Sequence, residues 1–519
     1  MSHHRRLFSW LAVVVLFVAL TPLGQAAPVD PPQVLVRIWL TTETDATRLA
    51  AAPLIPIAHE SRPAPYVLAR SEAAGLAWLA AQGFRSEVLD QDAASAQYVM
   101  ADMAAGYETT FADGVQLFSD SSRALWRRPA DAPVHASHHA WTLNQVVRLT
   151  LRVVPLPPTT ITPIALVQEI IDQVDLPRLM VNANEVSGQT ATTINGQPYT
   201  ITTRHTNSGT PIPQATHYMI ERLQRLGLTV TTHTWNATRP PNVIAEKPGL
   251  NPGAGIYIIC AHLDDMPSSG TAPGADDNGS GSVAVLHAAE ILTHYNFDAT
   301  LRFVLFTGEE QGLLGSAAYA NLVQNQDVRG VLNMDMIAWD NQGGPDMDLH
   351  AKSTVPGSMA LAQIFADVVT AYQLNLTPVV YSNGATASDH SPFWNVGIPA
   401  FLVIENYWSD GAIPADFNTY YHSSNDRTTH YNQPYFHRMV KASVAAFAHI
   451  ANIRTDCYWA DLNCDEVVTA LDLTRAASHW STSAGQWNYS RVYDADDNGV
   501  VDVVDVQRFA AAWGWISPG

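Results

Sequence analysis

Residues 260–281 read CAHLDDMPSSGTAPGADDNGSG, and residues 307–312 read TGEEQG. Each stretch begins where an apolar run ends, at residues 256–259 and at residues 301–306. Both are therefore expected to lie in loops that follow buried strands. They supply a histidine, several aspartates and a pair of glutamates. Carboxylate oxygens and an imidazole at strand ends are what a hydrolytic zinc site needs, so the sequence predicts a metal site at the edge of a buried sheet.

The chain around these loops alternates between strands and helices. Near-continuous apolar strands separated by helices are typical of a mostly parallel, mixed α/β sheet with helices on both faces. Ligands in such folds bind at the carboxyl ends of the strands, where all the candidate metal residues lie. We expect strands at 228–234, 242–245, 256–261, 301–306, 330–334 and 400–404, and helices from about Ile164 and at 215–226, 283–292, 356–372 and 434–453.

The residues before this region predict a separate unit. Alternating apolar residues indicate strands at 33–40, 66–71 and 84–90, with helices at 44–51 and 73–82. This pattern predicts a small α+β domain over residues 28–108, which is either a pro-segment or an accessory domain. Residues 109–163 are irregular and contain the run PLPP at 155–158, so they are expected to be a linker.

Composition limits the classes of function. The chain has 519 residues, enough for several domains, and 47% of them are hydrophobic, enough for real cores. The formal net charge of −20, from 48 acidic and 28 basic residues, excludes a nucleic-acid surface, which needs a basic face. An acidic balance suits an extracellular protein that binds cations.

The first residues predict export. A basic start, HHRR at 3–6, precedes an apolar run at 7–20 and small residues at 24–27. This is the pattern of a signal peptide over residues 1–27, and the run is short for a membrane span, the alternative interpretation. No later segment is apolar enough to cross a bilayer. We therefore expect a secreted, extracellular protein, free or associated with a cell surface or complex.

Each candidate residue has a simpler interpretation when taken alone. His262 and Asp264 could be a hydrogen-bonded pair at a strand end. One carboxylate in PGADDNG (273–279) could cap a helix, but the second one needs another explanation. Glu309 and Glu310 would repel each other at the end of a buried strand unless a cation lies nearby. On a turn, one glutamate can bind a metal while its neighbour faces the water molecule.

Later segments complete an ordered series. Asp335 ends an apolar strand in LNMDM, the segment SDH follows at 388–390, and His422 lies in YYHSSND. With the motifs AHLDD, PGADDNGSG, FTGEEQGLLGS and SDHSPFW, this series resembles the M28 family of zinc peptidases, the co-catalytic aminopeptidases. The resemblance covers roughly residues 164–453, and it implies a peptidase domain over residues 164–455 that acts on peptides.

The resemblance implies a role for each matching residue. His262 and Asp335 would bind one zinc ion, and Glu310 and His422 would bind a second. Asp276 would bridge the two ions, and the bond between Asp276 and Asp277 would be cis. Two further residues would assist: Glu309 as general base and Asp264 as the partner that orients His262.

One departure from the family concerns the oxyanion. Secreted aminopeptidases of this type often carry a tyrosine just before the segment that corresponds to SDH, whereas residues 385–387 here are Ala-Thr-Ala. Tyr381 is the closest upstream tyrosine and is the candidate donor to the oxyanion.

The tail, residues 456–519, contains two copies of an acidic loop. DLNCDEVVTALD (461–472) is echoed by DADDNGVVDVVD (494–505), and each copy precedes a helical segment. Oxygen ligands at alternate positions are what calcium prefers, although acidic turns without metal are the alternative. The candidate calcium ligands are Asp461, Asn463, Asp465, Thr469 and Asp472 in the first copy and Asp494, Asp496, Asn498, Asp502 and Asp505 in the second.

Paired loops of this kind resemble dockerin type I modules. The resemblance implies a helical module that binds one or two calcium ions and a cohesin-like partner. The sixth position is Gly499 in the second loop and Glu466 in the first, so the second is the better calcium site. Nearby, Cys457 and Cys464 are close enough in sequence to form a disulfide, whereas Cys260 ends an apolar run and is expected to be a buried thiol.

These observations favour a secreted dizinc aminopeptidase. A carboxypeptidase or a glutaminyl cyclase on the same fold is the nearest alternative, and the cyclases use one zinc ion. A non-catalytic surface protein that presents the docking tail is the alternative from another class.

Overall fold

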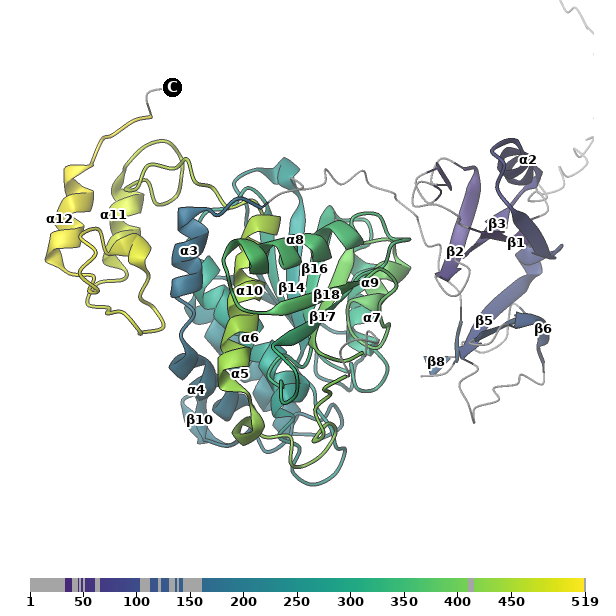
Figure 1. Ribbon diagram of the computed structural model, residues 1–519, viewed down its shortest axis with the longest axis horizontal. Coiled ribbons are helices and arrows are strands. Elements are labelled where there is room, and N and C mark those ends of the chain that lie inside the picture. The colour runs from purple at the N-terminus through teal and green to yellow at the C-terminus, as the bar shows by residue number, and fades with distance from the viewer. Residues whose placement is uncertain are drawn as a thin grey trace, which may run out of the picture.

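The structure is a computed structural model that describes residues 33–39, 45, 48–49, 52–60, 66–102, 113–119, 123–129, 136–137, 140–142, 161–408 and 415–517. The expected signal peptide and most of the helix expected at 44–51 lie outside these residues. Three parts follow one another along the chain: two N-terminal sheets, a large α/β domain and a small helical tail (Figure 1).

The α/β domain is built on an eight-stranded mixed sheet with the order β12-β13-β15-β14-β16-β19-β17-β18. The four central strands β15, β14, β16 and β19 are parallel, whereas β12, β13 and β17 each have an antiparallel neighbour. The expectation of a mixed sheet with a parallel centre is confirmed. The strands are β12 (Thr229–His233), β13 (Asn242–Lys247), β14 (Ile256–His262), β15 (Thr300–Phe306), β16 (Val328–Met334), β17 (Asp346–His350), β18 (Thr377–Tyr381) and β19 (Ala400–Glu405).

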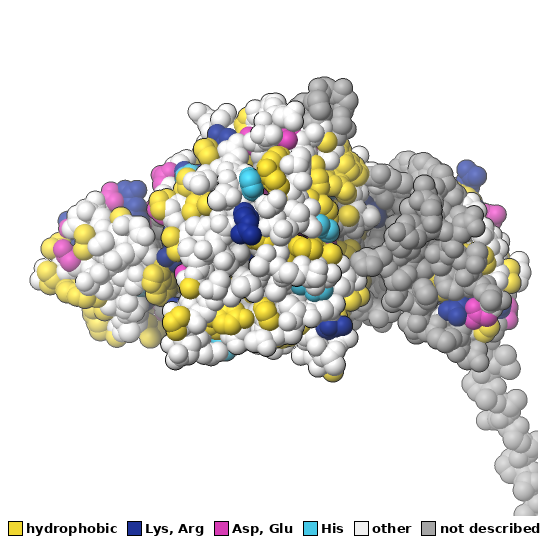
Figure 2. Space-filling view, turned by 90° about the horizontal axis from the view of Figure 1, so that it is seen from below, with side chains coloured by type: hydrophobic (Ala, Val, Ile, Leu, Met, Phe, Trp, Pro, Cys, Tyr) yellow, Lys and Arg dark blue, Asp and Glu magenta, His cyan; other side chains and the backbone are white. Residues whose placement is uncertain are grey.

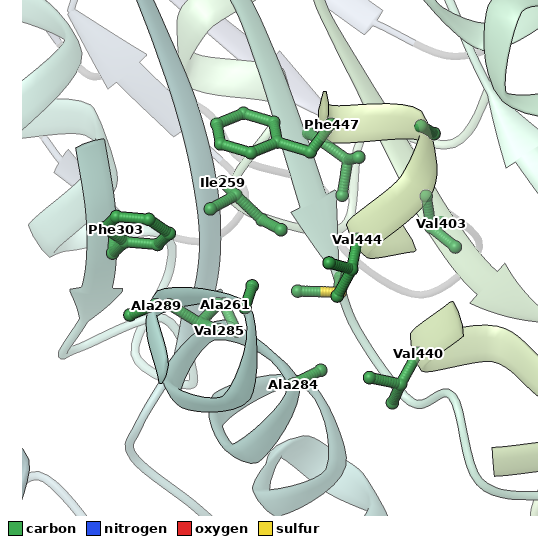
Figure 3. Close-up of a cluster of buried hydrophobic side chains, with 14 of the residues drawn as sticks. Ile259, Ala261, Ala284, Val285, Ala289, Phe303, Val403, Val440, Val444 and Phe447 are labelled. Atoms are coloured by element: carbon green, nitrogen blue, oxygen red, sulfur yellow. The ribbon is translucent and has the colours of Figure 1, made fainter. Parts of the chain in front are cut away.

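Helices cover both faces of this sheet, as expected. The larger core lies between the sheet and the helices α3, α4, α5, α6, α8 and α10. Figure 3 shows its centre, where Ile259 and Phe303 of the sheet meet Val285 of α6 and Val444 and Phe447 of α10. The helices are α3 (Ala165–Asp172), α4 (Leu176–Val186), α5 (Pro211–Arg225), α6 (Gly281–Leu292), α8 (Ser358–Ala371) and α10 (Gln433–Ile450).

The opposite face carries a smaller core. There α7 (Leu314–Val323) and α9 (Ser391–Asn395) pack on the side chains of the central strands that face away from α6. The period of two along each strand sends alternate side chains to the two cores, for example Ile259 to one and Ile258 to the other. Because both faces are buried, the polar loops at the strand ends are held on a rigid support.

The N-terminal part contains two antiparallel sheets in the described residues. The first, with the order β2-β3-β1-β4, contains the three strands expected at 33–40, 66–71 and 84–90 and one that was not expected, β2, and it is covered by α2 (Ala73–Ala81). Its strands are β1 (Val34–Trp39), β2 (Leu54–Glu60), β3 (Tyr66–Ser71) and β4 (Ser86–Asp90). A short two-stranded sheet, β10 (Thr192–Ile194) and β11 (Gln197–Tyr199), belongs to the α/β domain.

The second N-terminal sheet corrects the expected domain boundary. Its order is β6-β7-β5-β9-β8, so residues from 109–163, expected to be a linker, pair with a strand of residues 28–108. The strands are β5 (Ala96–Asp102), β6 (Val115–Ser119), β7 (Arg123–Pro129), β8 (Ala136–Ser137) and β9 (Ala140–Thr142). The irregular interpretation is wrong for β6 to β9, because β7 and β9 pair with β5, β6 pairs with β7, and β8 pairs with β9.

The tail folds around two short helices, α11 (Ala470–Ala477) and α12 (Val503–Ala511). Each begins with a capping box, made by Thr469 and Asp472 for α11 and by Asp502 and Asp505 for α12. The expected disulfide between Cys457 and Cys464 is present, and Cys260 is a buried free thiol. Within the described residues, no helix is long and apolar enough to cross a membrane.

Candidate metal centre

The candidate site lies at the carboxyl ends of the central parallel strands. His262 is the last residue of β14, the turn with Glu309 and Glu310 follows β15, and Asp335 follows β16 directly. Because neighbouring parallel strands end at the same edge, the sheet brings these side chains together. His422 reaches the same place from the loop before α10, with a left-handed backbone at φ 53°.

Six side chains form two clusters of potential metal ligands. In the first, His262, Glu309 and Asp335 place one ligand atom each within 4.8 Å of one another. In the second, Asp277, Glu310 and His422 do the same. The clusters touch, because Nε2 of His262 lies 3.2 Å from Oδ1 of Asp277 and Nε2 of His422 lies 3.1 Å from its Oδ2.

The residue between the two histidines is Asp277, and the expectation that Asp276 stands there is wrong. The Asp276 carboxylate turns away from both imidazoles. It accepts hydrogen bonds from the backbone N–H of Ala338 (2.9 Å) and from the side-chain amide of Asn418 (2.9 Å). The buried side chain of Glu405 also hydrogen-bonds to the Asp276 carboxylate. The reason is local geometry: two successive residues of a tight turn point in different directions, and the turn presents the second one.

Glycine and the loop of His422 shape this turn. Gly274 has φ +44°, and a Cβ there would lie 2.5 Å from the Asp277 carbonyl oxygen. The Asp426 carboxylate accepts the backbone N–H groups of Asp276 (3.1 Å) and Asp277 (3.0 Å). The cis peptide bond lies between Asp277 and Asn278, one residue after the expected position. Asp426 thus joins the loop that carries His422 to the turn that carries Asp277.

Asp264 holds the glutamate turn, which differs from its expected role. Its carboxylate accepts the backbone N–H groups of Glu309 (3.2 Å) and Glu310 (3.3 Å) and the hydroxyl of Thr206 (2.9 Å). The ring of His262 is oriented instead by the backbone carbonyl of Asp264, 3.1 Å from Nδ1, while the carboxylate is 3.9 Å away. The main chain of Asp264 therefore directs Nε2 of His262 into the site, and its side chain fixes both glutamates.

Asp335 is held from behind by a polar chain. Its Oδ2 accepts the Ser388 hydroxyl at 2.6 Å, and that hydroxyl also accepts the side-chain amide of Asn333 at 2.7 Å. Its Oδ1 lies 3.2 Å from Nε2 of His262. The expected segment 388–390 thus contributes a supporting hydroxyl.

The electrostatics of the site favour cations. Burial raises the pKa of Glu309 well above its ordinary value, partly opposed by His262. Burial and the nearby Asp277 raise the pKa of Glu310 to about 8. Burial would also raise the pKa of Asp277, but the two histidines hold it below its ordinary value.

The histidines respond in the opposite sense. Burial alone would lower the pKa of His422, but hydrogen bonds to Asp277 and Glu310 raise it to about 10. Asp335 and Glu309 similarly raise the pKa of the buried His262 well above its ordinary value. Among the ion pairs of the described residues, these carboxylates are matched only by the two histidines. Four carboxylates thus face two imidazoles in one buried place, so the site lacks positive charge.

One aromatic residue of the site, Tyr421, is not predicted by the sequence motifs. The ring of Tyr421 stacks on His422 with centroids 3.6 Å apart. Burial and then the carboxylates Asp277 and Glu310 raise its pKa, so the phenol lies within electrostatic reach of the centre. Its position directly before a ligand histidine was the available clue. Tyr381 stacks on His350 and donates to the carbonyl of Trp408 (3.4 Å) at the β17–β18 edge.

The tail places part of each predicted calcium set together. In the second loop Asp494, Asp496 and Asp505 offer oxygens within 4.8 Å of one another. Asp502 caps α12, and the Asn498 side chain accepts the N–H of Val500 (2.8 Å). In the first loop the Asp461 carboxylate accepts the N–H groups of Asp465 and Glu466, and the Asn463 side chain donates to Asp465. The other two residues of this set, Thr469 and Asp472, cap α11. The grouping is therefore tighter in the second loop.

A mixed α/β sheet that ends in two His/carboxylate clusters is typical of metallopeptidases, and the comparisons agree with this class. Residues 242–447, which contain all six cluster residues, match the model of Peptidase family M28. This part of the α/β domain is therefore similar to Peptidase family M28.

Individual relatives point the same way. Aminopeptidase Y of Saccharomyces cerevisiae is 35% identical over 162 residues, which are 31% of this chain and 29% of the yeast protein. A probable leucine aminopeptidase of Arthroderma otae is 31% identical over 223 residues, which are 40% of this chain and 56% of that protein. The chain thus spans about a third to a half of the length of these two relatives.

A solved structure shares the fold. The LapA aminopeptidase of Legionella pneumophila superposes with a TM-score of 0.52 and 17% identity, over 69% of this chain and 98% of that chain. At this identity the match establishes the fold only.

Proposed function

We propose that this protein is a secreted metallo-aminopeptidase that removes N-terminal residues from peptides with the help of two zinc ions. The observation that carries the proposal is the pair of ligand clusters with the Asp277 carboxylate between them. The names of the relatives, aminopeptidases in each case, give the reaction.

The residues present fit two zinc ions. Each cluster offers the nitrogen and carboxylate donors that zinc prefers. Oε1 of Glu310 is buried without a hydrogen-bond partner, and Nε2 of His422 faces only the carboxylates of Asp277 (3.1 Å) and Glu310 (3.0 Å) in the second cluster. Their burial is costly unless a cation joins them. His262 and Asp335 would hold one ion, Glu310 and His422 the other, and Asp277 would bridge them.

Bound zinc supplies a Lewis acid that polarises the scissile carbonyl and lowers the pKa of a water molecule. Glu309 is the residue placed to take the proton from that water. Its Oε2 lies 4.0 Å from Nε2 of His262, and its N–H is fixed by Asp264. The raised pKa of Glu309 suits a group that accepts a proton and then passes it to the leaving amine.

Tyr421 is the better-placed phenol for the oxyanion. Its ring lies on His422, and its pKa responds to the carboxylates of both clusters. A phenol hydroxyl at this position can donate to the carbonyl oxygen of the substrate as negative charge develops. Tyr381 remains the alternative from the sequence, held in the aromatic group of His350 and Trp408.

Two clusters favour the peptidase over a cyclase, which would need one zinc ion. A carboxypeptidase on the same centre remains the second candidate, and blocked peptides separate the two reactions. For the tail we propose that the second loop binds calcium through Asp494, Asp496 and Asp505, that the first loop is a weaker site, and that the module docks to a cohesin-like partner outside the cell.

The proposed function is tested by hydrolysis of peptides with free and acetylated N-termini, before and after chelation. We expect free amino acids to be released only from peptides with a free N-terminus. Chelation should abolish the release, and added zinc should restore it. Release from the carboxyl end, or unchanged activity after complete removal of metal, would contradict the proposal.

A further inference from the structure

The tail is in close contact with the peptidase domain, at the end of α6. The guanidinium of Arg475 donates to the backbone carbonyls of Thr293 and His294, each at 3.3 Å, directly after that helix ends. A cation at this position satisfies carbonyls that have no partner within the helix and interacts favourably with the helix dipole. Arg475 also donates to the carbonyl of Leu462 (2.6 Å), which accepts the side-chain amide of Asn296 (3.1 Å) from the peptidase domain.

An aromatic group closes this contact. Tyr493 is 1% exposed and stacks on His479, with ring centroids 3.9 Å apart and an interplanar angle of 7°. His294 of the peptidase domain meets both rings edge-on, at 5.4 Å from Tyr493 and 5.1 Å from His479. The neighbouring Val492 packs on the main core of the peptidase domain. This side of the tail is therefore fitted to its own chain.

The hydrogen bonds in this group have a direction. Nε of Arg475 donates to the hydroxyl oxygen of Tyr493 (3.3 Å), so the Tyr493 hydroxyl is free to donate to Nδ1 of His294 (3.2 Å). Nδ1 can accept that hydrogen bond only when His294 is neutral. His479 uses its own Nδ1 to donate to the carbonyl of Asn488 (2.7 Å).

We propose that this contact is a clamp whose partner is the peptidase domain of the same chain, and that acid opens it by protonating His294 and His479. Either proton would place a cation beside Arg475 in a buried interface, and a proton on Nδ1 of His294 would also break the chain of hydrogen bonds.

The charges around the histidines support this behaviour. The groups that face His294 are His479 and Arg475 from the tail, Lys247 from β13 and Glu290 from α6, so only one of them is acidic. Burial and these cations lower the pKa of His294 to about 3, and burial and Arg475 lower the pKa of His479. A lowered pKa in the closed form means that the open form binds protons more readily. The clamp is therefore complete above a pH of about 6.5 and weakens as the pH falls below that value.

The clamp leaves another part of the tail uncovered. Leu471 is 67% exposed, Trp513 57% and Ile516 67%, and Figure 2 shows hydrophobic side chains gathered on the tail at the left. Closing of the clamp thus fixes the orientation in which these residues are presented.

Hydrogen–deuterium exchange of the full chain tests the clamp, with rates corrected for the intrinsic effect of pH. Between about pH 7.5 and about pH 5, protection of peptides covering 293–297 and 475–493 should fall about tenfold per pH unit below 6.5 through His294, and further through His479. Protection of β14 and β16 should stay constant. Equal protection of the clamp peptides at both pH values would overturn the proposal.

Two variants assign the effect to the named groups. Tyr493→Phe removes one hydroxyl and should lower protection of 293–297 about fivefold at neutral pH. The matched control is Tyr489→Phe, because that hydroxyl donates to Asp494 within the tail (2.8 Å), and it should leave 293–297 unchanged. His479→Phe keeps a ring against Tyr493 and should reduce the acid effect to that of one imidazole. Equal results for the two tyrosine variants, or an unchanged acid effect in His479→Phe, would contradict the clamp.

Discussion

Replacement of Glu309 by glutamine separates catalysis from metal binding. The substitution keeps the shape of the side chain, and the backbone N–H that Asp264 fixes at 3.2 Å is unaffected. What is lost is a buried carboxylate whose Oε2 lies 4.0 Å from Nε2 of His262. Because the amide cannot accept the proton of water, kcat should fall by about two to four decades, which corresponds to about 3–5 kcal/mol of transition-state free energy.

The assay compares kcat, KM and bound zinc for the two neighbouring glutamates. Glu309→Gln should retain both zinc ions and a KM close to that of the parent, because the substrate is bound by other groups. Glu310→Gln is the matched control: it removes a carboxylate 3.0 Å from Nε2 of His422 and should lose the second ion. If Glu309→Gln turned over within about tenfold of the parent with its zinc in place, the assignment of the base would be refuted.

Four further substitutions test the surroundings of the centre. Asp277→Asn should abolish binding of the second zinc ion, whereas Asp276→Asn should retain both ions. Metal analysis of the two purified variants measures this, and equal zinc contents would contradict the geometry. Asp426→Asn weakens the hydrogen bonds that hold the turn and should reduce zinc affinity about 10- to 100-fold, measured by competition with a chelating dye. An unchanged affinity would exclude this positioning role of Asp426. Tyr421→Phe should lower kcat by about two decades while zinc content stays constant, and a change confined to KM would argue against donation to the oxyanion.

The sequence predicted those site residues whose position follows directly from a strand. His262 and Asp335 each end or follow an apolar parallel strand, and such strands meet at one edge. Glu309 and Glu310 follow β15, which lies between β13 and β14 in the sheet, in the same way. For these residues, the hydrophobic pattern and the expected sheet topology were sufficient to predict their place in the site.

The sequence predicted Asp276 between the two histidines, whereas the structure places Asp277 there. Sequence pattern alone was insufficient to choose between these two adjacent aspartates. Two adjacent aspartates in one glycine-rich turn are equivalent in the sequence, and their directions depend on backbone dihedrals. Gly274 is left-handed at φ +44°, and Asp277 departs from helical geometry with φ −102° and ψ 97°. The carboxylate of Asp426, about 150 positions later, holds both backbone amides of the pair.

Other features also depended on contacts distant in sequence. The strand β6 is largely exposed at the edge of its sheet, so it lacks the alternation that would have revealed it within the expected linker. The clamp joins His294 to Tyr493, about 200 positions apart, and nothing local in either segment indicates the other. The two acidic loops, by contrast, were readable because their spacing repeats.

The central claim is that one pocket holds two metal ions across Asp277, and anomalous X-ray scattering at the zinc edge tests it most directly. Crystals of the zinc-loaded protein should give two peaks, one beside His262 and Asp335 and one beside Glu310 and His422, with Asp277 between them. A single peak, or peaks at residues outside these clusters, would contradict the account.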